Sequence, residues 1–261
     1  MTALVATDLD GTVMFSLAGP PAGALTVDPV ADTYMTSAVV AGWSRLATAG
    51  VLVPVTTRTV DQYQRLMLPG PPPRYAVVGN GTRLLVRGES DPTWQRAVRK
   101  DLVAAGAGFQ TVWKQAVRWR SGRAFRLVRG VDEAFVYLAA ERRDSWLVAF
   151  AHEASAWADQ RGWRASLQGR KLYLVPVALD KAAAVARLAA RLGTDEVFAG
   201  GDSLLDAQML RSASASIRPN HGELNQTGFS APNCQATVEG GTPAGDEIVA
   251  WYLSRAGLGD G

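Results

Sequence analysis

Residues 7–12 read Thr-Asp-Leu-Asp-Gly-Thr and end an apolar run that begins at Ala3. The run is continuous rather than alternating, which is typical of a strand buried on both faces. Because residues i and i+2 of an extended chain point the same way, we expect Asp8 and Asp10 to face one crevice at the carboxyl end of this strand. A divalent cation or a shared proton relieves the repulsion between two such carboxylates. Aspartates that simply form the turn at Gly11 explain an isolated motif of this kind equally well.

A second acidic pair follows another apolar run, in the stretch Phe-Ala-Gly-Gly-Asp-Ser-Leu-Leu-Asp at residues 198–206. Asp202 comes directly after the predicted strand, and Asp206 lies on the first turn of a predicted helix, so both can face the same crevice. Aspartate is also favoured at helix N-termini, where it caps the backbone and interacts with the helix dipole. Capping is the better explanation of this pair alone, whereas two acidic pairs at strand ends in one chain favour a metal site.

Two further segments carry groups that suit an anion. Val-Pro-Val-Thr-Thr-Arg at residues 53–58 ends an apolar run with hydroxyl groups, and the amides of the helix that follows can hold an anion. Lys181 begins an amphipathic pattern over residues 181–192. A lysine at a helix start is usually a solvated surface charge, and the alternative is a cation placed where carboxylates and a phosphoryl group meet. Along the chain, the polar segments follow in the order carboxylate pair, hydroxyl, lysine and carboxylate pair. This order favours a cation at Lys181 that meets carboxylates and a phosphoryl group.

Apolar runs and helical patterns alternate in the two outer parts of the chain. The predicted strands are residues 3–7, 51–55, 75–78, 172–177 and 196–199, and the predicted helices are residues 33–49, 60–68, 181–192 and 204–212. Alternating strands and helices are the signature of a doubly wound parallel sheet. We therefore predict an α/β fold with a doubly wound, Rossmann-like parallel sheet as its core.

The middle of the chain breaks this alternation. Tight turns join short strand candidates at residues 123–129, 134–139, 145–150, 163–167 and 170–175, with helices near residues 93–105 and 151–160. The pattern predicts an antiparallel meander with helices, which we interpret as an inserted α+β cap domain at residues 83–172. Residues 1–82 and 173–261 then form the core. The predicted cap holds six of the eight tryptophans, of which we expect most to be buried and Trp119 to be the most exposed.

Composition and charge limit what the whole chain can be. The 261 residues include 27 basic and 24 acidic ones, and the formal net charge of +3 is weak support for a nucleic-acid partner. Residues 83–172 carry a net +8 and the rest a net −5, which suits a basic lid for an anionic substrate and an acidic core that binds a metal. A solvated arginine-rich surface is the alternative. The chain has a single cysteine, no apolar run long enough to span a bilayer and an N-terminus unlike a signal peptide. These features predict a cytoplasmic protein that is not in the membrane.

The four polar segments resemble, in order and spacing, the four motifs of the haloacid dehalogenase (HAD) superfamily of phosphohydrolases. An insertion between the second and third motifs is similar to the cap of the branch that includes Cof-like proteins and sucrose-phosphate phosphatases. Finer similarities to that branch are Asp-Gln-Tyr at residues 61–63, Gly-Asn-Gly-Thr at residues 79–82 and Thr-Val-Glu-Gly-Gly-Thr-Pro-Ala-Gly at residues 237–245. The resemblance covers essentially the whole chain.

The resemblance implies a role for each motif residue. Asp8 would be the nucleophile that forms an aspartyl phosphate, and Asp10 the general acid that protonates the leaving alcohol and then activates water. Thr56 would hydrogen-bond a phosphoryl oxygen, and Lys181 would neutralise charge between the nucleophile and the phosphate.

The resemblance also implies Mg²⁺ as the cofactor. The metal would be held by Asp8, Asp10, Asp202 and Asp206, with Asp10 contributing its backbone carbonyl and Asp206 acting directly or through water. Further contacts to the substrate would come from Thr57, Arg58, Asn80 and Asn220.

Two positions depart from the family pattern, since Leu205 stands where many relatives carry Asn and Thr57 stands where Gly is common. Neither change removes a group that the chemistry requires. The leading hypothesis is a Mg²⁺-dependent phosphoric monoester hydrolase that acts on a small phosphorylated metabolite, such as a sugar phosphate or a glycosyl phosphate. One alternative is a phosphomutase that uses the same aspartyl phosphate, and another is a non-catalytic module that binds RNA or an acidic partner.

Overall fold

The computed structural model of the chain describes residues 3–16, 20–106, 108–122 and 125–259. The chain divides into two compact units, of which the first comprises Met1–Asp91 and Lys181–Gly261 and the second comprises Pro92–Asp180. The second unit therefore begins at residue 92 instead of the predicted 83 and ends at residue 180 instead of 172. Strand pairing explains both corrections. β6 (Arg83–Val86) pairs with β5 (Tyr75–Val78) of the first unit. β11 (Lys171–Pro176), predicted both as a core strand over residues 172–177 and as a cap strand over residues 170–175, pairs with two strands of the second unit.

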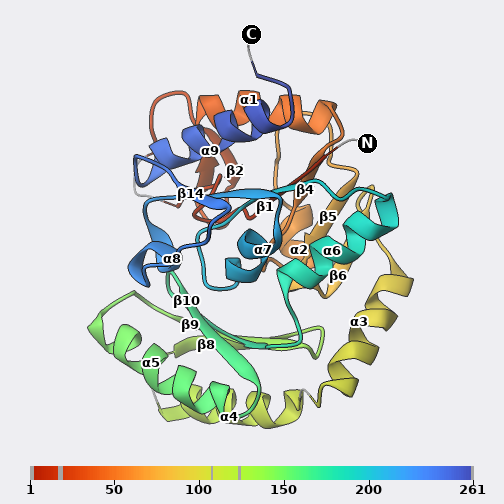
Figure 1. Ribbon diagram of the computed structural model, residues 1–261. Coiled ribbons are helices and arrows are strands. Elements are labelled where there is room, and N and C mark those ends of the chain that lie inside the picture. Colours follow the sequence, from red (N-terminus) through yellow and green to blue (C-terminus); the bar gives the residue numbers. More distant parts are fainter. Residues whose placement is uncertain (1–2, 17–19, 107, 123–124, 260–261) are drawn as a thin grey trace. The chain divides into compact units, whose positions relative to one another are not determined.

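A five-stranded parallel sheet forms the centre of the first unit, in the order β14-β13-β12-β1-β4 (Figure 1). Its strands span Leu4–Thr7 (β1), Leu52–Pro54 (β4), Val197–Gly200 (β12), Ala215–Arg218 (β13) and Cys234–Ala236 (β14). All four residues of β1 are buried, and Ala6 lies opposite Ala199 of β12 and Val53 of β4. The predicted doubly wound parallel sheet is confirmed, with β13 and β14 as strands that the sequence analysis missed.

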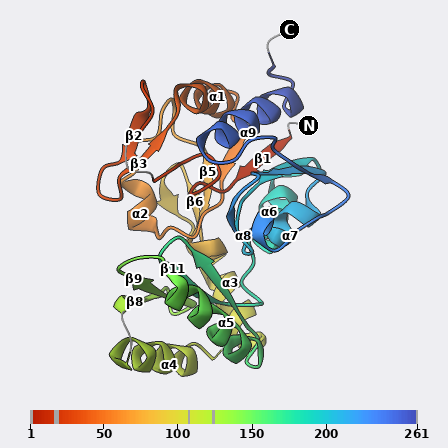
Figure 2. The same cartoon turned by 90° about the vertical axis from the view of Figure 1, so that its left-hand side faces the viewer.

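Helices cover both faces of this sheet (Figure 1; Figure 2). The helices of the first unit span Ser37–Thr48 (α1), Val60–Gln64 (α2), Lys181–Leu192 (α6), Ala207–Ser212 (α7), Gly222–Gln226 (α8) and Thr242–Arg255 (α9). α1 and α9 pack together on one face, where Trp43 and Tyr252 share a buried cluster with Val5 of β1, and α6 and α7 lie on the other. Within the described ranges, none of the helices is long and apolar enough to cross a membrane.

Two smaller antiparallel sheets accompany the parallel one. Their strands are Leu25–Asp28 (β2) and Thr33–Met35 (β3) in one sheet, and β5, β6 and Glu89–Ser90 (β7) in the other. The predicted helix over residues 33–49 is corrected, because residues 33–35 pair with β2 and α1 begins only after the N-cap Thr36. β5, predicted as a core strand, pairs with β6 and meets the end of β4 at a bridge between Val55 and Val77.

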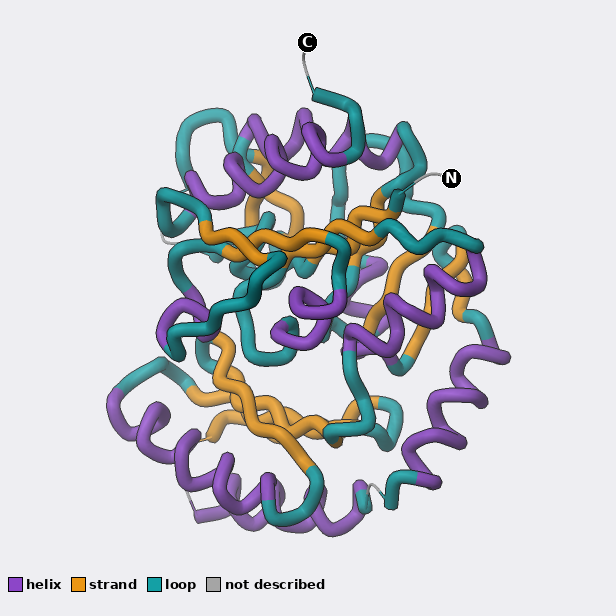
Figure 3. Tube along the Cα trace, in the orientation of Figure 1, coloured by secondary structure: helices purple, strands orange, loops and turns teal. Residues whose placement is uncertain are grey.

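The second unit combines an antiparallel sheet with helices, as predicted for the cap (Figure 3). Its strands run in the order β10-β11-β9-β8 and span Phe125–Val131 (β8), Phe135–Ala140 (β9), Trp163–Gln168 (β10) and β11. Its helices span Pro92–Ala104 (α3), Phe109–Gly122 (α4) and Ser145–Asp159 (α5). An aromatic cluster joins α4, α5 and β8, since Phe150 lies 5.2 Å from Trp119 and 5.3 Å from Phe125, measured between ring centroids.

Two predictions within this unit are wrong. Residues 145–150, predicted as a strand, begin α5, because the side chain of Asp144 accepts a hydrogen bond from Leu147 N and caps that helix. Trp119, predicted to be the most exposed of the six tryptophans, is buried in the aromatic cluster, whereas Trp113, Trp146 and Trp157 are half-buried. In addition, α4 matches no predicted element, and the first two residues of the predicted strand 123–129 lie outside the described residues.

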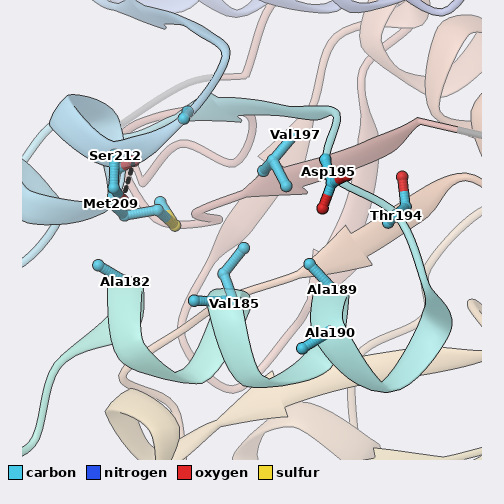
Figure 4. A pocket seen from close by; sticks show the side chains of 11 residues that line it. Ala182, Val185, Ala189, Ala190, Thr194, Asp195, Val197, Met209 and Ser212 are labelled. Atoms are coloured by element: carbon cyan, nitrogen blue, oxygen red, sulfur yellow. Dashed lines mark hydrogen bonds between the residues drawn. The ribbon is translucent and has the colours of Figure 1, made fainter.

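A cavity of about 250 Å³ lies between α6 and α7 in the first unit (Figure 4). Its walls are mostly apolar and include Val185 and Ala189 of α6, Met209 of α7 and Val197 of β12. None of the residues that the sequence analysis assigned to the site lines this cavity.

Candidate active site

The segment of residues 7–12 turns sharply at the end of β1. Asp8 N donates to Gly200 O at 2.9 Å, which continues the pairing of β1 with β12, and the Asp8 side chain is buried. Gly11 then adopts a φ of 81°, a left-handed conformation that favours glycine. A Cβ on Gly11 would lie 2.6 Å from Asp202 Oδ2. Glycine is therefore needed here both for the turn and for the close approach of the two acidic segments.

Lys181 lies among the predicted acidic residues. It is the first residue of α6 and is only 1% exposed, which excludes its interpretation as a solvated surface charge. Its Nζ donates to Asp8 Oδ1 at 2.7 Å and to Asp206 Oδ1 at 2.6 Å. The structure thus joins a carboxylate at the end of β1 to one at the start of α7 through a buried ammonium group.

Three carboxylates lie within reach of one ion. Asp8, Asp202 and Asp206 each offer an oxygen within 4.8 Å of the others. Asp206 is held on both oxygens, because Oδ2 accepts hydrogen bonds from Ser203 N at 3.0 Å and Ser203 Oγ at 2.7 Å while Oδ1 accepts from Lys181. Although Asp206 is the N-cap residue of α7, its side chain makes no capping hydrogen bond. Simple helix capping therefore does not explain this aspartate.

The acidic cluster fits a divalent cation. Three carboxylates surround one ammonium group, so two negative charges are left without a compensating charge within the cluster. An all-oxygen donor set of this kind is the type that Mg²⁺ prefers. Gly222 approaches the carboxylate of Asp202 as Gly11 does, and a Cβ on Gly222 would lie 2.8 Å from Oδ2. The two glycines keep side-chain atoms away from this carboxylate.

Burial and repulsion change the protonation of this cluster. Burial, partly offset by Lys181, raises the pKa of Asp8 from its ordinary 3.8 to about 7. Burial and the charges of Asp8 and Asp206 also raise the pKa of Asp202. Burial alone lowers the pKa of Lys181, but the two carboxylates that it contacts more than offset this and raise it. The lysine is therefore charged, while the carboxylates lack a second cation.

Arg58, predicted as a substrate contact, binds two aspartates. Its Nε and Nη2 donate to the two oxygens of Asp10 at 2.7 Å each, and its Nη1 donates to Asp28 Oδ2 at 2.6 Å. Asp28 ends β2, is fully buried, and also accepts hydrogen bonds from Arg65. Burial alone raises the pKa of Asp28, but the hydrogen bonds from Arg65 and Arg58 more than offset this and lower it. Arg58 is thus a direct partner of the predicted general acid.

The predicted residues Thr56, Thr57 and Asn80 are all buried where β4 ends. Thr56 Oγ1 accepts a hydrogen bond from Arg58 N at 3.1 Å, and Thr56 O accepts one from Asn80 N at 2.9 Å. Asn80 lies in the 3₁₀ turn η1 (Gly79–Gly81) with a φ of 56°. The backbone hydrogen bond from Asn80 N holds the end of β4 against the turn that follows β5.

Asn220 and His221 follow β13. Asn220 is exposed, and its N and Nδ2 donate to Thr237 Oγ1 at 2.9 Å and to Val238 O at 3.3 Å. His221 Nδ1 accepts from Gly241 N at 2.9 Å, so Nε2 carries the proton that is donated to Gly11 O at 2.8 Å. Burial lowers the pKa of His221, which favours this neutral ring. His221 thereby ties the segment 7–12 to the loop before α9.

The sequence analysis missed Asp28, Ser203 and His221 as residues of the site. Ser203 stands between the two aspartates of the stretch 198–206, so its position beside Asp202 was a usable signal. Asp28 gave none, because its partner Arg58 is 30 residues further along the chain.

The similarity of this chain to known proteins lies in its fold. No protein-family model matches the sequence, and no curated protein matches it. Among solved structures, the sucrose-phosphatase from Synechocystis sp., determined with sucrose and phosphate, has a TM-score of 0.63 at 14% identity and covers 98% of this chain and 99% of its own. A trehalose-6-phosphate phosphatase related protein has a TM-score of 0.58 at 14% identity, with the same shares of 98% and 99%. A phosphatase of the HAD superfamily from Bacteroides thetaiotaomicron has a TM-score of 0.55 at 13% identity and covers 99% and 96%.

The chain has the fold of the HAD phosphatases. The predicted resemblance is thus confirmed for the fold, over nearly the whole length of the chain. Within this HAD fold, the first and fourth predicted motifs lie on the adjacent strands β1 and β12, and Lys181 reaches both from the start of α6.

Proposed function

We propose that the protein is a Mg²⁺-dependent phosphatase that hydrolyses a phosphomonoester of a small metabolite through an aspartyl phosphate on Asp8. One observation carries the proposal, which is the buried Lys181 that bridges Asp8 and Asp206 beside Asp202. Phosphoryl transfer mainly requires in-line positioning and compensation of negative charge. The cluster offers a nucleophile held by a cation, and the HAD fold supports the same chemistry.

In the first step, Asp8 attacks phosphorus. Its Oδ1 is held by Lys181, which leaves Oδ2 to form the new bond as the bond from phosphorus to the leaving oxygen breaks. The ammonium group of Lys181 offsets negative charge on the transferred group. For this step Asp10 is protonated on one oxygen, which gives up its hydrogen bond from Arg58 while the other oxygen keeps its own. The side chain of Asp10 is 41% exposed, so the leaving oxygen can approach it and take this proton.

In the second step, Asp10 is a carboxylate and takes a proton from water. The water oxygen attacks phosphorus, the bond from phosphorus to Asp8 Oδ2 breaks, and inorganic phosphate leaves. The buried hydroxyl of Thr56, at the end of β4, is the proposed contact to a phosphoryl oxygen.

Asp8, Asp202 and the backbone carbonyl of Asp10 would hold Mg²⁺. Because both oxygens of Asp206 already accept hydrogen bonds, its proposed role is to position Lys181 and to support the metal through water. When bound, Mg²⁺ polarises the phosphoryl group and offsets its negative charge.

The proposed substrate is a sugar phosphate or a glycosyl phosphate. Support comes from the matched structures, of which one is a sucrose-phosphatase solved with sucrose and phosphate and another is related to trehalose-6-phosphate phosphatase. The unit Pro92–Asp180 contains 15 basic and 8 acidic residues, a net +7, which favours a substrate with further negative charge. We propose this small molecule, rather than a nucleic acid or a membrane, as the partner, and the cytoplasm as the location.

A panel of phosphosugars tests the proposal. With Mg²⁺, at least one member, such as sucrose 6-phosphate or trehalose 6-phosphate, is expected to release inorganic phosphate, and excess EDTA is expected to stop the release. Isomerised substrate without free phosphate would instead favour a phosphomutase. No turnover of any member by folded, Mg²⁺-loaded protein would contradict the proposal.

Metal binding is expected to release protons near neutral pH. Because burial raises the pKa of Asp8 to about 7 and also raises that of Asp202, the metal-free site retains protons that a bound cation displaces. Titration calorimetry with Mg²⁺ at pH 6.5, in buffers of different ionisation enthalpy, measures this release. The part of the release that comes from Asp8 should shrink as the pH rises above about 7. No proton release at pH 6.5 despite Mg²⁺ binding would contradict the prediction.

The same shift sets how the stability of the metal-free protein depends on pH. The folded chain holds the Asp8 proton between about pH 3.8 and about 7, whereas the unfolded chain has lost it. The contribution of Asp8 to the free energy of unfolding therefore falls as the pH rises through this window. Added Mg²⁺ is expected to reverse the loss, because it binds the ionised carboxylate of the folded chain.

A further inference from the structure

Asp10, Arg58, Asp28 and Arg65 form one continuous chain of ion pairs in the first unit. The guanidinium of Arg58 uses three nitrogens on two carboxylates, with Nε and Nη2 on Asp10 and Nη1 on Asp28. Arg65 completes the chain on the other side of Asp28, with Nη2 at 3.0 Å from Oδ2. Two acids and two arginines leave no net charge, so the chain of ion pairs is balanced without any ligand.

Exposure within this chain of ion pairs falls from Asp10 to Asp28. The Asp10 side chain is 41% exposed, that of Arg58 is 9% exposed, and that of Asp28 is fully buried. Asp28 is also fixed by the backbone, because its Oδ1 accepts hydrogen bonds from Val30 N at 3.2 Å and Ala31 N at 3.3 Å in the β2–β3 turn. The buried end is therefore anchored, and the open end is the residue that meets substrate and water.

A bidentate arginine fixes both the position and the rotation of a carboxylate, which a lysine or a single hydrogen bond does not. Arg58 itself keeps this orientation only if its third nitrogen is held, and Asp28 holds it at 2.6 Å. We propose that Asp28 is a positioning residue, which acts through Arg58 to orient the carboxyl group of Asp10 for proton transfer. The inference rests on the proposed function only for its catalytic consequence, since the chain of contacts exists without it.

The consequence depends on how much a leaving group needs a proton. Phenyl phosphate releases a basic phenolate and needs the proton of Asp10, whereas p-nitrophenyl phosphate releases a weakly basic phenolate and needs it far less. Both probes are small and similar in shape, so they do not depend on recognition of a particular sugar. A residue that merely supports the fold would affect both probes alike.

The test compares Asp28→Asn with wild-type protein in single turnovers with Mg²⁺. The rate of phenol release is expected to fall about tenfold and that of p-nitrophenol by less than about twofold, with little change in KM. Arg58→Lys keeps the charge but cannot bridge both aspartates, so we expect the same selective loss. The matched control is Asp32→Asn, at an exposed aspartate of the same β2–β3 turn, which is expected to match wild type on both probes. Equal losses on the two probes, or none, would overturn the inference.

A spectroscopic readout decides the inference without turnover. In ¹⁵N-labelled wild type, the Nε–H of Arg58 donates to Asp10 and is expected to exchange slowly with water, and its resonance is assigned by its loss in Arg58→Lys. In Asp28→Asn, with folding checked by thermal unfolding, this exchange is expected to be at least about tenfold faster. Unchanged exchange would refute the role of Asp28. If wild type hydrolyses neither probe but the Arg58 Nε–H exchanges faster in Asp28→Asn, the proposed function fails and the positioning by Asp28 stands.

Discussion

Replacing Asp8 with Asn is expected to abolish phosphate release, with a loss of at least about 10⁴-fold, equivalent to about 5.5 kcal/mol of transition-state stabilisation. Asn has nearly the same shape as Asp, but its amide is not a nucleophile that can form the acyl phosphate. The reason to expect so large an effect is geometric. Asp8 is buried at the end of β1 and held by Lys181 at 2.7 Å, so no neighbouring carboxylate can take its place without moving the backbone.

The measurement combines two signals. Steady-state phosphate release is followed with the best phosphosugar of the panel, and rapid quenching with ³²P-labelled substrate reports the covalent phosphoenzyme. Wild type should become labelled and Asp8→Asn should not. Asp61→Asn, at an exposed aspartate of α2 in the same unit, serves as the matched control and is expected to behave like wild type. Labelling of Asp8→Asn at the wild-type level would place the nucleophile elsewhere.

Loss of folding is not expected to cause this effect. The pKa of Asp8 is raised to about 7, so a neutral side chain is already tolerated at this position. The amide oxygen of Asn can still accept the hydrogen bond from Lys181, and Asp206 continues to balance the lysine charge. A thermal midpoint close to that of wild type would confirm that only the chemistry is lost.

The meeting of the acidic segments was predictable from the sequence because it follows from topology. Carboxyl ends of parallel strands meet at one edge of a sheet, so an apolar run followed by polar residues identifies the edge before the strand order is known. The segments that end in Asp8 and Asp202 lie on neighbouring strands for this reason. Lys181 was harder to assign, because only its burial distinguishes it from a surface lysine.

Elements without a periodic pattern could not be predicted in the same way. β13 and β14 span four and three residues with mixed polarity, and β14 lies at the edge of the sheet, where no alternation is required. Residues 145–150 show the converse problem, because a short apolar run fits a strand and a helix equally well. Asp144 caps the N-terminus of the helix by accepting a hydrogen bond from Leu147 N, and this contact is seen only in the structure.

Contacts between side chains that lie far apart in the sequence could not be predicted. Arg58 was assigned to the substrate because its segment resembles the second HAD motif. In the structure Arg58 donates a hydrogen bond to Asp28, which lies on the β2–β3 hairpin. Local sequence does not determine where this hairpin packs. The contact is decided by tertiary packing, so a single sequence provides no signal for it.

Lys181→Met is the second change with a large expected effect. Met has a similar length and packs well in a buried position, but it leaves Asp8 and Asp206 facing each other without the ammonium group. Breaking a buried ion pair by removing one partner costs about 3–5 kcal/mol, because the remaining charges stay desolvated. We expect a loss of this size in the free energy of unfolding at neutral pH, together with loss of phosphate release.

The pH dependence separates this cause from poor packing. Without the ammonium group, Asp8 and Asp206 can take up protons as the pH falls, so the folded state of the variant binds more protons than its unfolded state. The loss in free energy of unfolding relative to wild type should therefore shrink toward pH 5. Urea unfolding at pH 5 and pH 8 measures it, with the exposed Lys100→Met as the matched control, expected within about 0.5 kcal/mol of wild type. Adding Asp206→Asn to Lys181→Met removes one of the two negative charges that repel each other. The double variant is expected to regain part of the stability but not the activity. A deficit that is the same at both pH values and unrelieved by Asp206→Asn would mean that Lys181 stabilises the fold through its packing, and that its charge is not what the acidic cluster requires.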